Sequence, residues 1–131
     1  MRAVPALLLA ALLAASHARA GEDGSTRPPR LTQVPAAARA LPSPLEGSAD
    51  AARAGVKLFA RYCASCHGAA GEGALRGPSL RTAGVRAATP GALYWVVTNG
   101  AVRTGMPVWS NLPEPRRWQI VSYVRSLGPL E

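Results

Sequence analysis

The chain has 131 residues, which is enough for one domain with appendages. It carries 15 basic and 7 acidic residues, a net charge of +8, but the arginines are spread along the chain and no basic run reaches five residues. With a single phenylalanine as well, this pattern argues against nucleic-acid binding, which favours a basic stripe interleaved with aromatic residues.

The first twenty residues have the plan of a secretory signal peptide. Arg2 precedes a run of mostly Ala, Leu and Val over residues 3–15, and an A-x-A site at residues 18–20 permits cleavage, with a rival site ending at Ala18. The apolar run is shorter than the ~20 residues that cross a bilayer, and no later segment reaches that length. We therefore expect residues 1–20 to be removed, which leaves a periplasmic protein without a membrane span. An uncleaved membrane anchor is the alternative.

The next segment, residues 21–49, is rich in Pro, Ala, Gly and Ser. Five prolines interrupt every helical or strand period, and few large apolar residues are available for burial. We predict a flexible spacer here, with a tether or a strap around a partner as the alternative. The folded domain is placed at residues 50–131.

The first helix of this domain is predicted to run from residue 51 directly into Cys63. Asp50 is positioned to cap it, and Gly55 is the one interruption in an otherwise unbroken helical stretch. Val56, Phe59 and Ala60 fall on one face of this helix, which indicates that it is amphipathic.

Two further helices follow, separated by long loops rich in glycine and proline. Thr89 caps the second, Pro90 takes its first position, and Asn99-Gly100 ends it. The third has Pro115 in its first turn, and its apolar residues recur at helical spacing: Trp118, Val121, Val124 and Leu127. No strand alternation appears, so the domain is predicted to be all-α. About 80 residues make a small core, and such domains commonly need a metal or another staple.

The motif that carries chemistry is C-x-x-C-H at residues 63–67, a pattern of c-type haem attachment. Its two thiols, Cys63 and Cys66, can form thioethers with the two porphyrin vinyl groups, and His67 can then supply one axial nitrogen to the iron. We predict one covalent haem c. Three alternatives fit less well: a thioredoxin-like redox pair lacks its βαβ context, structural zinc needs two more ligands, and a disulfide closing so small a loop adds little stability.

The sixth ligand is predicted to be Met106. After signal cleavage the net charge is +6, from 13 basic and 7 acidic residues, and His67 and Met106 are the one histidine and one methionine that remain. Met106 lies between Gly105 and Pro107 in a polar loop, and methionine ligation opposite histidine is an established haem arrangement. Lys57 and an open sixth position are the alternatives.

With these motifs, residues 50–131 resemble the class I monohaem cytochrome c family, in particular small bacterial periplasmic members. The residues that carry the resemblance are the attachment motif, Gly55 and Phe59 on the first helix, the segment Gly77-Pro78-Ser79-Leu80, Met106-Pro107, and Trp118 to Val124 on the last helix. The resemblance implies a cytochrome c-like fold in which the first and last helices cross. It also implies that the Pro78 carbonyl orients the His67 imidazole and that Leu80 packs on the haem face.

The function predicted from these features is electron transfer without substrate chemistry, so we do not expect an enzyme. The expected role is a shuttle from a periplasmic dehydrogenase toward a terminal oxidase or another acceptor, as a monomer whose basic surface meets acidic partners. A dedicated dehydrogenase subunit and a haem sensor or peroxidatic protein are the alternatives. Candidates to bind the haem propionates are Arg76, Arg81, Arg103 and Trp109.

Overall fold

The computed structural model describes residues 29–130, so the predicted signal peptide at residues 1–20 lies outside the described part. Its helices are α1 (Pro29–Thr32), α2 (Ala36–Arg39), α3 (Ala49–Tyr62), α4 (Ala64–His67), α5 (Ala83–Arg86), α6 (Pro90–Asn99), the 3₁₀ helix η1 (Val102–Thr104) and α7 (Glu114–Ser126). Within this range β pairing is confined to two isolated bridges, which confirms the all-α prediction. None of these helices is long and apolar enough to cross a membrane.

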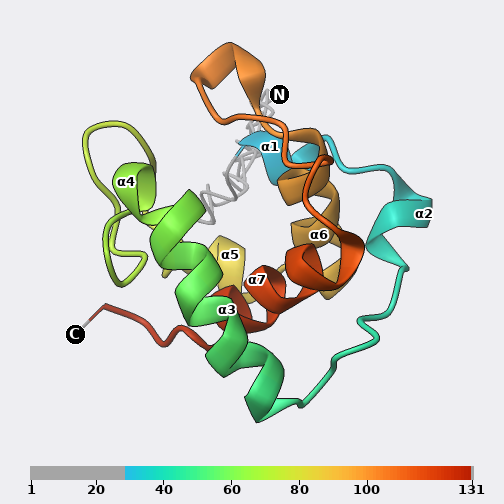
Figure 1. The fold of residues 1–131 in the computed structure, drawn as a ribbon. Coiled ribbons are helices and arrows are strands. Elements are labelled where there is room, and N and C mark those ends of the chain that lie inside the picture. The colour runs from blue at the N-terminus through green and yellow to red at the C-terminus, as the bar shows by residue number, and fades with distance from the viewer. Residues whose placement is uncertain (1–28, 131) are drawn as a thin grey trace, which may run out of the picture.

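The centre of the fold is the crossing of α3 and α7, which Figure 1 shows side by side. The helices meet at Gly55, where a Cβ atom would lie 2.1 Å from the Gln119 carbonyl oxygen and 2.8 Å from the Tyr123 Cβ. One turn later the rings of Phe59 and Tyr123 meet edge to face, with centroids 5.0 Å apart. The crossing that the family resemblance implies is present, and it fixes the end of α3 from which the motif continues.

The apolar face predicted for the first helix is wrong in two of its three positions. Phe59 is buried, but Val56 is 46% exposed and Ala60 is exposed as well. The buried face instead includes Ala51, Gly55 and Phe59. Because the close approach to α7 occurs at a glycine, the face that packs contains a position without a side chain, and apolar spacing does not reveal it.

The predicted cap of this helix is also wrong. The Ser48 hydroxyl accepts a hydrogen bond from the Ala51 N–H (3.1 Å), so the helix begins at Ala49. Asp50 lies in the first turn and forms an ion pair with Arg53. Serine and aspartate are both good caps, and here the serine lies at the position that reaches the free N–H.

The other two helices match their predictions. The Thr89 hydroxyl caps α6 by accepting from the Ala92 N–H (3.2 Å), and Pro90 takes the first position. On α7 the predicted apolar residues are all buried, with exposed fractions of 2% for Trp118, 1% for Val121, 8% for Val124 and 9% for Leu127. The two helices pack through stacked rings of Tyr94 and Trp118, whose centroids are 4.1 Å apart.

Residues 30–48 form a segment that we call the strap, and the prediction of a flexible spacer is wrong here. Leu31 and Val34 are 5% and 3% exposed and belong to the same buried cluster as the helices of the domain. The strap lies so close to α6 that a Cβ atom at Gly91 would be 2.1 Å from the Ala38 carbonyl oxygen. The prolines do not prevent this packing because none lies inside a helix: Pro29 and Pro35 stand at the starts of α1 and α2, and Pro42 and Pro44 lie in the irregular segment after α2. The strap packs against its own domain (Figure 1).

Candidate haem site

Residues 63–67 continue directly from α3 as a single further turn. The Cys63 N–H donates to the Phe59 carbonyl (2.8 Å), which closes α3, and α4 begins at the next residue. The N–H groups of Cys66 and His67 then both donate to the Cys63 carbonyl, at 3.1 and 3.0 Å. Both thiols and the imidazole are therefore carried on one turn at the end of the helix that is locked to α7.

The imidazole of His67 is 9% exposed and is held by one hydrogen bond. Its Nδ1 atom lies 2.8 Å from the carbonyl oxygen of Pro78. Because a carbonyl can only accept, Nδ1 carries the proton and donates it, and in the neutral ring the lone pair belongs to Nε2. The structure thus contains the contact that the family resemblance implies for Pro78.

The loop after α4 folds back tightly to bring this carbonyl to the ring. The Gly73 N–H donates to the His67 carbonyl (2.6 Å), and the loop then passes directly beneath the turn. A Cβ atom at Gly77 would lie 2.8 Å from the Cys66 carbonyl oxygen and 3.1 Å from Nδ1 of His67. A side chain at this position would push the loop away from the imidazole, so Gly77 is needed for the bond to Pro78.

The surroundings of the free ring nitrogen of His67, Nε2, show whether these residues suit a haem iron. In the part of the chain that the structure describes, Nε2 has no hydrogen-bond partner. No buried side-chain nitrogen or oxygen there lacks a partner, so Nε2 faces accessible space rather than sealed core. A neutral imidazole held by its other nitrogen, with its lone pair accessible, is the form that binds haem iron. The turn therefore fits the cofactor that the motif predicts.

The two cysteines are partly buried and unpaired. Burial, together with the charge of Cys66, raises the pKa of the Cys63 thiol to about 11. A reactive thiol of the thioredoxin kind has a lowered pKa, so Cys63 is poorly suited to that chemistry. Among residues 29–130 no group of three or more His, Cys, Asp and Glu side chains could hold a metal ion.

Met106 belongs to the loop that follows α6, and Figure 1 shows this loop extending from α6 on the side away from α4. Ala101 and Met106 form an antiparallel bridge, with N–H to carbonyl distances of 3.0 and 3.1 Å, that closes the loop around η1. The Met106 side chain is half-buried. The structure thus joins Cys63, Cys66, His67 and Pro78 in one unit, and Met106 belongs to another.

A ring contact that the sequence reasoning missed joins these two units. Tyr62 directly precedes Cys63, Trp109 lies three residues after Met106, and their ring centroids are 5.3 Å apart. The sequence suggests Trp109 only as a partner for a haem propionate and suggests no role for Tyr62. Aromatic residues flanking both segments were the available signal, but the sequence does not show that they meet.

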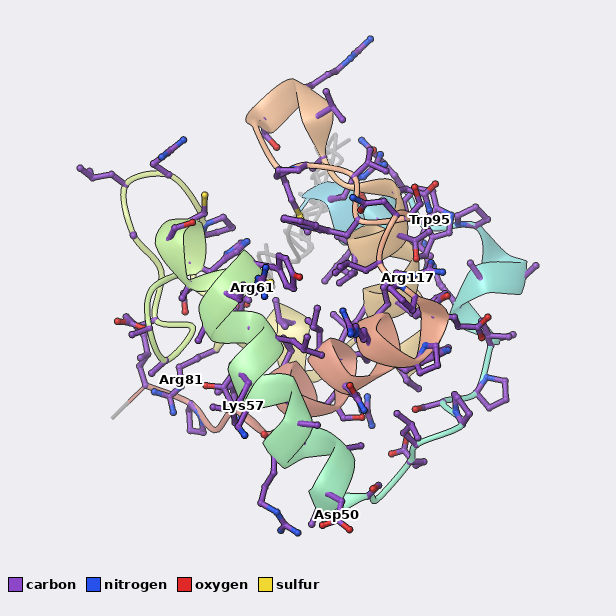
Figure 2. The ribbon with its side chains drawn as sticks, viewed as in Figure 1. Asp50, Lys57, Arg61, Arg81, Trp95 and Arg117 are labelled. Atoms are coloured by element: carbon purple, nitrogen blue, oxygen red, sulfur yellow. The ribbon has the colours of Figure 1, made fainter. Side chains whose placement is uncertain are left out.

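The remaining predicted residues occupy varied positions. Leu80 is half-buried and packs against the core cluster. Arg81, a candidate for a propionate, donates through Nε to the Gly128 carbonyl (2.9 Å) and is thus tied to the C-terminal segment. Lys57, an alternative sixth ligand, is exposed on α3 (Figure 2). It lines a groove between α3 and α7.

Comparisons with known proteins agree with this geometry. Residues 50–124 match the family model described as "Cytochrome C oxidase, cbb3-type, subunit III". The chain is 34% identical over 114 residues to the cbb3-type cytochrome c oxidase subunit FixP of Bradyrhizobium sp. (strain ORS 278). That alignment covers 82% of this chain but only 38% of FixP, so the chain spans about two fifths of this relative.

Two solved structures of cytochrome cL have a similar fold. The protein from the marine methylotrophic bacterium Methylophaga aminisulfidivorans MPT is 31% identical with a TM-score of 0.56, over 64% of this chain and 57% of its own. The protein from Hyphomicrobium denitrificans is 21% identical with a TM-score of 0.57, over 76% and 66%, and supports the fold alone. The resemblance to class I cytochromes c is thereby confirmed. Because the family match covers more than half of the chain, the protein belongs to this family of c-type cytochromes, and its cofactor is one covalent haem c.

Proposed function

We propose that this chain carries single electrons on one haem c attached through Cys63 and Cys66, with His67 and Met106 as axial ligands. The observation that carries the proposal is the hydrogen bond from Nδ1 of His67 to the Pro78 carbonyl (2.8 Å), which leaves Nε2 accessible at the end of a C-x-x-C-H turn. When bound, the haem supplies one-electron chemistry between ferric and ferrous iron.

The protein's part in this function is to hold the ligands still. The Pro78 carbonyl fixes the orientation of the imidazole and raises the basicity of Nε2. The turn that bears His67 continues from α3, which is locked to α7 at Gly55, so the ligand has little freedom to move when the charge of the site changes. Leu80 packs against the core cluster, and we expect it also to contact the haem face and to help exclude water. Methionine ligation opposite histidine raises the reduction potential.

Substitution of the two axial ligands tests the proposal. Met106→Ala should abolish the sulfur-to-iron band of the oxidised protein, leave the haem attached, and lower the reduction potential. His67→Ala should greatly reduce the yield of protein with attached haem. The exposed residue Val108, on the same loop as Met106, offers a matched control, because Val108→Ala keeps both ligands. A wild-type spectrum with five-coordinate iron would contradict the proposal and favour a sensor or peroxidatic protein.

We also propose a docking surface for acidic partners on the groove between α3 and α7, which has a volume of about 680 Å³. What supports it is the charge of its lining. Its basic residues are Arg53, Lys57 and Arg61 on α3 and Arg116 on α7. Figure 2 labels Lys57 and Arg61 along α3. The lining extends to Tyr62, the residue before Cys63, so a partner held here would be near the attachment turn. Attraction of this kind speeds association and weakens with salt.

Small redox reagents of opposite charge test this surface. Lys57→Glu, which lowers the net charge by the same amount as Arg86→Glu, should slow oxidation by anionic ferricyanide at low salt and leave or raise the rate with a cationic cobalt complex. Arg86→Glu, on the exposed end of α5, is the control outside the groove and should have a smaller effect. Equal effects of the two changes would show that net charge, and not this groove, directs the reagents.

The place of this protein in an electron-transfer chain is a further part of the proposal. We infer a periplasmic shuttle from a dehydrogenase toward a terminal oxidase or another acceptor, with a dedicated dehydrogenase subunit as the alternative. FixP is itself a subunit of a cbb3-type oxidase, which supports an oxidase as one destination. Export with cleavage after Ala18 or Ala20 is tested by sequencing the N-terminus of the mature protein. Gel filtration of the protein from its native source distinguishes a free carrier from a subunit.

A further inference from the structure

The strap reaches the base of the loop that presents Met106, and it does so through Arg30. Leu31 and Val34 anchor the strap in the core on the C-terminal side of this arginine. Arg30 itself is half-buried, and its guanidinium lies 4.6 Å above the ring of Trp95 on α6. Figure 2 labels Trp95 on α6, the helix that leads into this loop.

The charged guanidinium of Arg30 donates a hydrogen bond to one backbone carbonyl at the base of the loop. Its Nε donates to the Gly100 carbonyl oxygen (2.7 Å), and Nη1 donates to Oε1 of Gln33 (3.0 Å). Among residues 29–130 the ion pairs are those of Arg53 and Arg125, so no carboxylate pairs with Arg30 in this range. A short hydrogen bond from a charged donor is among the stronger kinds, and this one joins residues 70 positions apart.

The Met106 loop leaves α6 at Gly100 and returns to the same place at Pro107. The φ of Gly100, +63°, turns the chain out of α6, and a Cβ atom here would lie 2.5 Å from the Pro107 carbonyl oxygen. The next residue, Ala101, forms the bridge to Met106. The Gly100 carbonyl that Arg30 binds therefore lies one residue before this bridge. A contact that holds Gly100 in place also holds Ala101 and, through the bridge, Met106.

The tip of the loop has little support of its own. Val102 is 69% exposed, and no atom lies within 4 Å of the position that a Cβ at Gly105 would take. The Thr104 hydroxyl donates to the Ala101 carbonyl (3.0 Å), so this bond connects the tip only to the base of the same loop. The position of Met106 therefore depends on how firmly the base is held.

We propose that Arg30 is a positioning residue for the sixth ligand, and that the strap acts as a clamp on the Met106 loop. This inference rests on the proposed ligation by Met106. Without the guanidinium, the loop base loses its contact with the strap, and the sulfur leaves its position more often. External ligands then compete more successfully for the same coordination site.

Holoprotein variants of the strap test the clamp. Arg30→Ala should speed amide exchange in residues 101–106 roughly tenfold and tighten imidazole binding to the oxidised protein by a similar factor, as expected when a hydrogen bond from a charged group is lost. Arg30→Lys keeps the charge and a donor, so its amide exchange and its imidazole affinity should lie between those of wild type and Arg30→Ala. Arg39→Ala is the matched control, because Arg39 bonds only to the Val34 and Thr32 carbonyls inside the strap.

The outcomes separate the clamp from the proposed ligation. If wild type lacks the sulfur-to-iron band, ligation by Met106 fails, and exchange in the loop still reports on the clamp. Loop exchange in Arg30→Ala that equals wild type or Arg39→Ala overturns the clamp. A uniform rise in exchange through α3, α6 and α7 overturns it too, because it would show a general loss of stability. Faster exchange confined to residues 101–106, with tighter imidazole binding, supports it.

Discussion

The segments that carry the two proposed axial ligands are held in opposite ways. The His67 turn continues from α3, and its hydrogen bonds join residues close in sequence, of which the bond to Pro78 spans only 11 positions. The Met106 loop has one backbone bridge of its own, and an arginine 70 positions away binds its base. One ligand is thus built into local structure, and the other depends on tertiary packing.

This difference indicates which ligand is easier to displace. Local bonds on a helix locked to its neighbour break only when that helix unfolds, whereas a loop held at its base can open alone. We therefore expect damage on the His67 side to affect retention of the haem and damage on the Met106 side to affect mainly the sixth ligand. Changes at single glycines test this contrast, because they add one methyl group at a chosen place.

The largest effect is expected for Gly100→Ala on the Met106 side. Gly100 has φ +63° and ψ −169°, a region nearly confined to glycine, and the added Cβ would lie 2.5 Å from the Pro107 carbonyl oxygen. Strain and overpacking together should lower the free energy of unfolding by roughly 2–4 kcal/mol. The sulfur-to-iron band should be lost while the haem stays attached, as read by denaturant unfolding and optical spectra.

Gly105→Ala is the control for this change. Gly105 also has a positive φ, +93°, but its Cβ would meet no atom within 4 Å. It should therefore show the cost of the backbone alone, roughly 1 kcal/mol, and retain the band. Loss of the band in both variants would show that the whole loop, and not its base, holds Met106.

A smaller effect is expected for Gly77→Ala on the His67 side. The added Cβ would lie 2.8 Å from the Cys66 carbonyl oxygen, so the loop must move away from the imidazole, at a cost of roughly 1–3 kcal/mol. The longer bond to Pro78 makes Nε2 less basic, and the reduction potential should rise. Gly128→Ala, in open space, should change neither quantity. An unchanged potential with reduced stability would separate the loop's packing role from its effect on the iron.

The parts of this fold that follow from local sequence were predictable. Thr89 and Pro90 mark the start of α6, and the apolar repeat of α7 from Trp118 to Leu127 is buried as its spacing indicates. Both are readable because capping and helical periodicity depend on residues a few positions apart. The attachment turn at residues 63–67 has the same local character.

Apart from the cap of α3, which Ser48 and not Asp50 provides, the errors occur where distant segments meet. The packed face of α3 includes Gly55, which has no side chain, and only the approach of α7 makes it a contact position. The strap carries few apolar residues, yet Leu31 and Val34 suffice because the surface that receives them already exists on the folded domain. Neither the contact of Arg30 with Gly100 nor that of Tyr62 with Trp109 has a signal in the sequence, because each depends on tertiary packing.

The contact between the two aromatic rings is where the two sides of the site are expected to influence each other, and its effect should be the smallest of those considered. A double-mutant cycle with Tyr62→Ala and Trp109→Ala should give a coupling of about 0.5–1.5 kcal/mol in unfolding free energy, as aromatic pairs do. Tyr62→Phe keeps the ring and should retain most of this coupling energy.

The same cycle measured by imidazole affinity sharpens the contrast between the two ligands. Tyr62 is attached to the rigid side. Trp109 follows the loop and donates from its N–H to the Val97 carbonyl (3.2 Å), so the ring pair should restrain the segment that leaves the loop base, whereas Arg30 binds the segment that enters it. Each single change should then tighten imidazole binding, and the double variant should bind imidazole only slightly more tightly than either single variant. Fully additive effects on imidazole affinity would mean that the two rings act separately and that their contact does not restrain the Met106 loop.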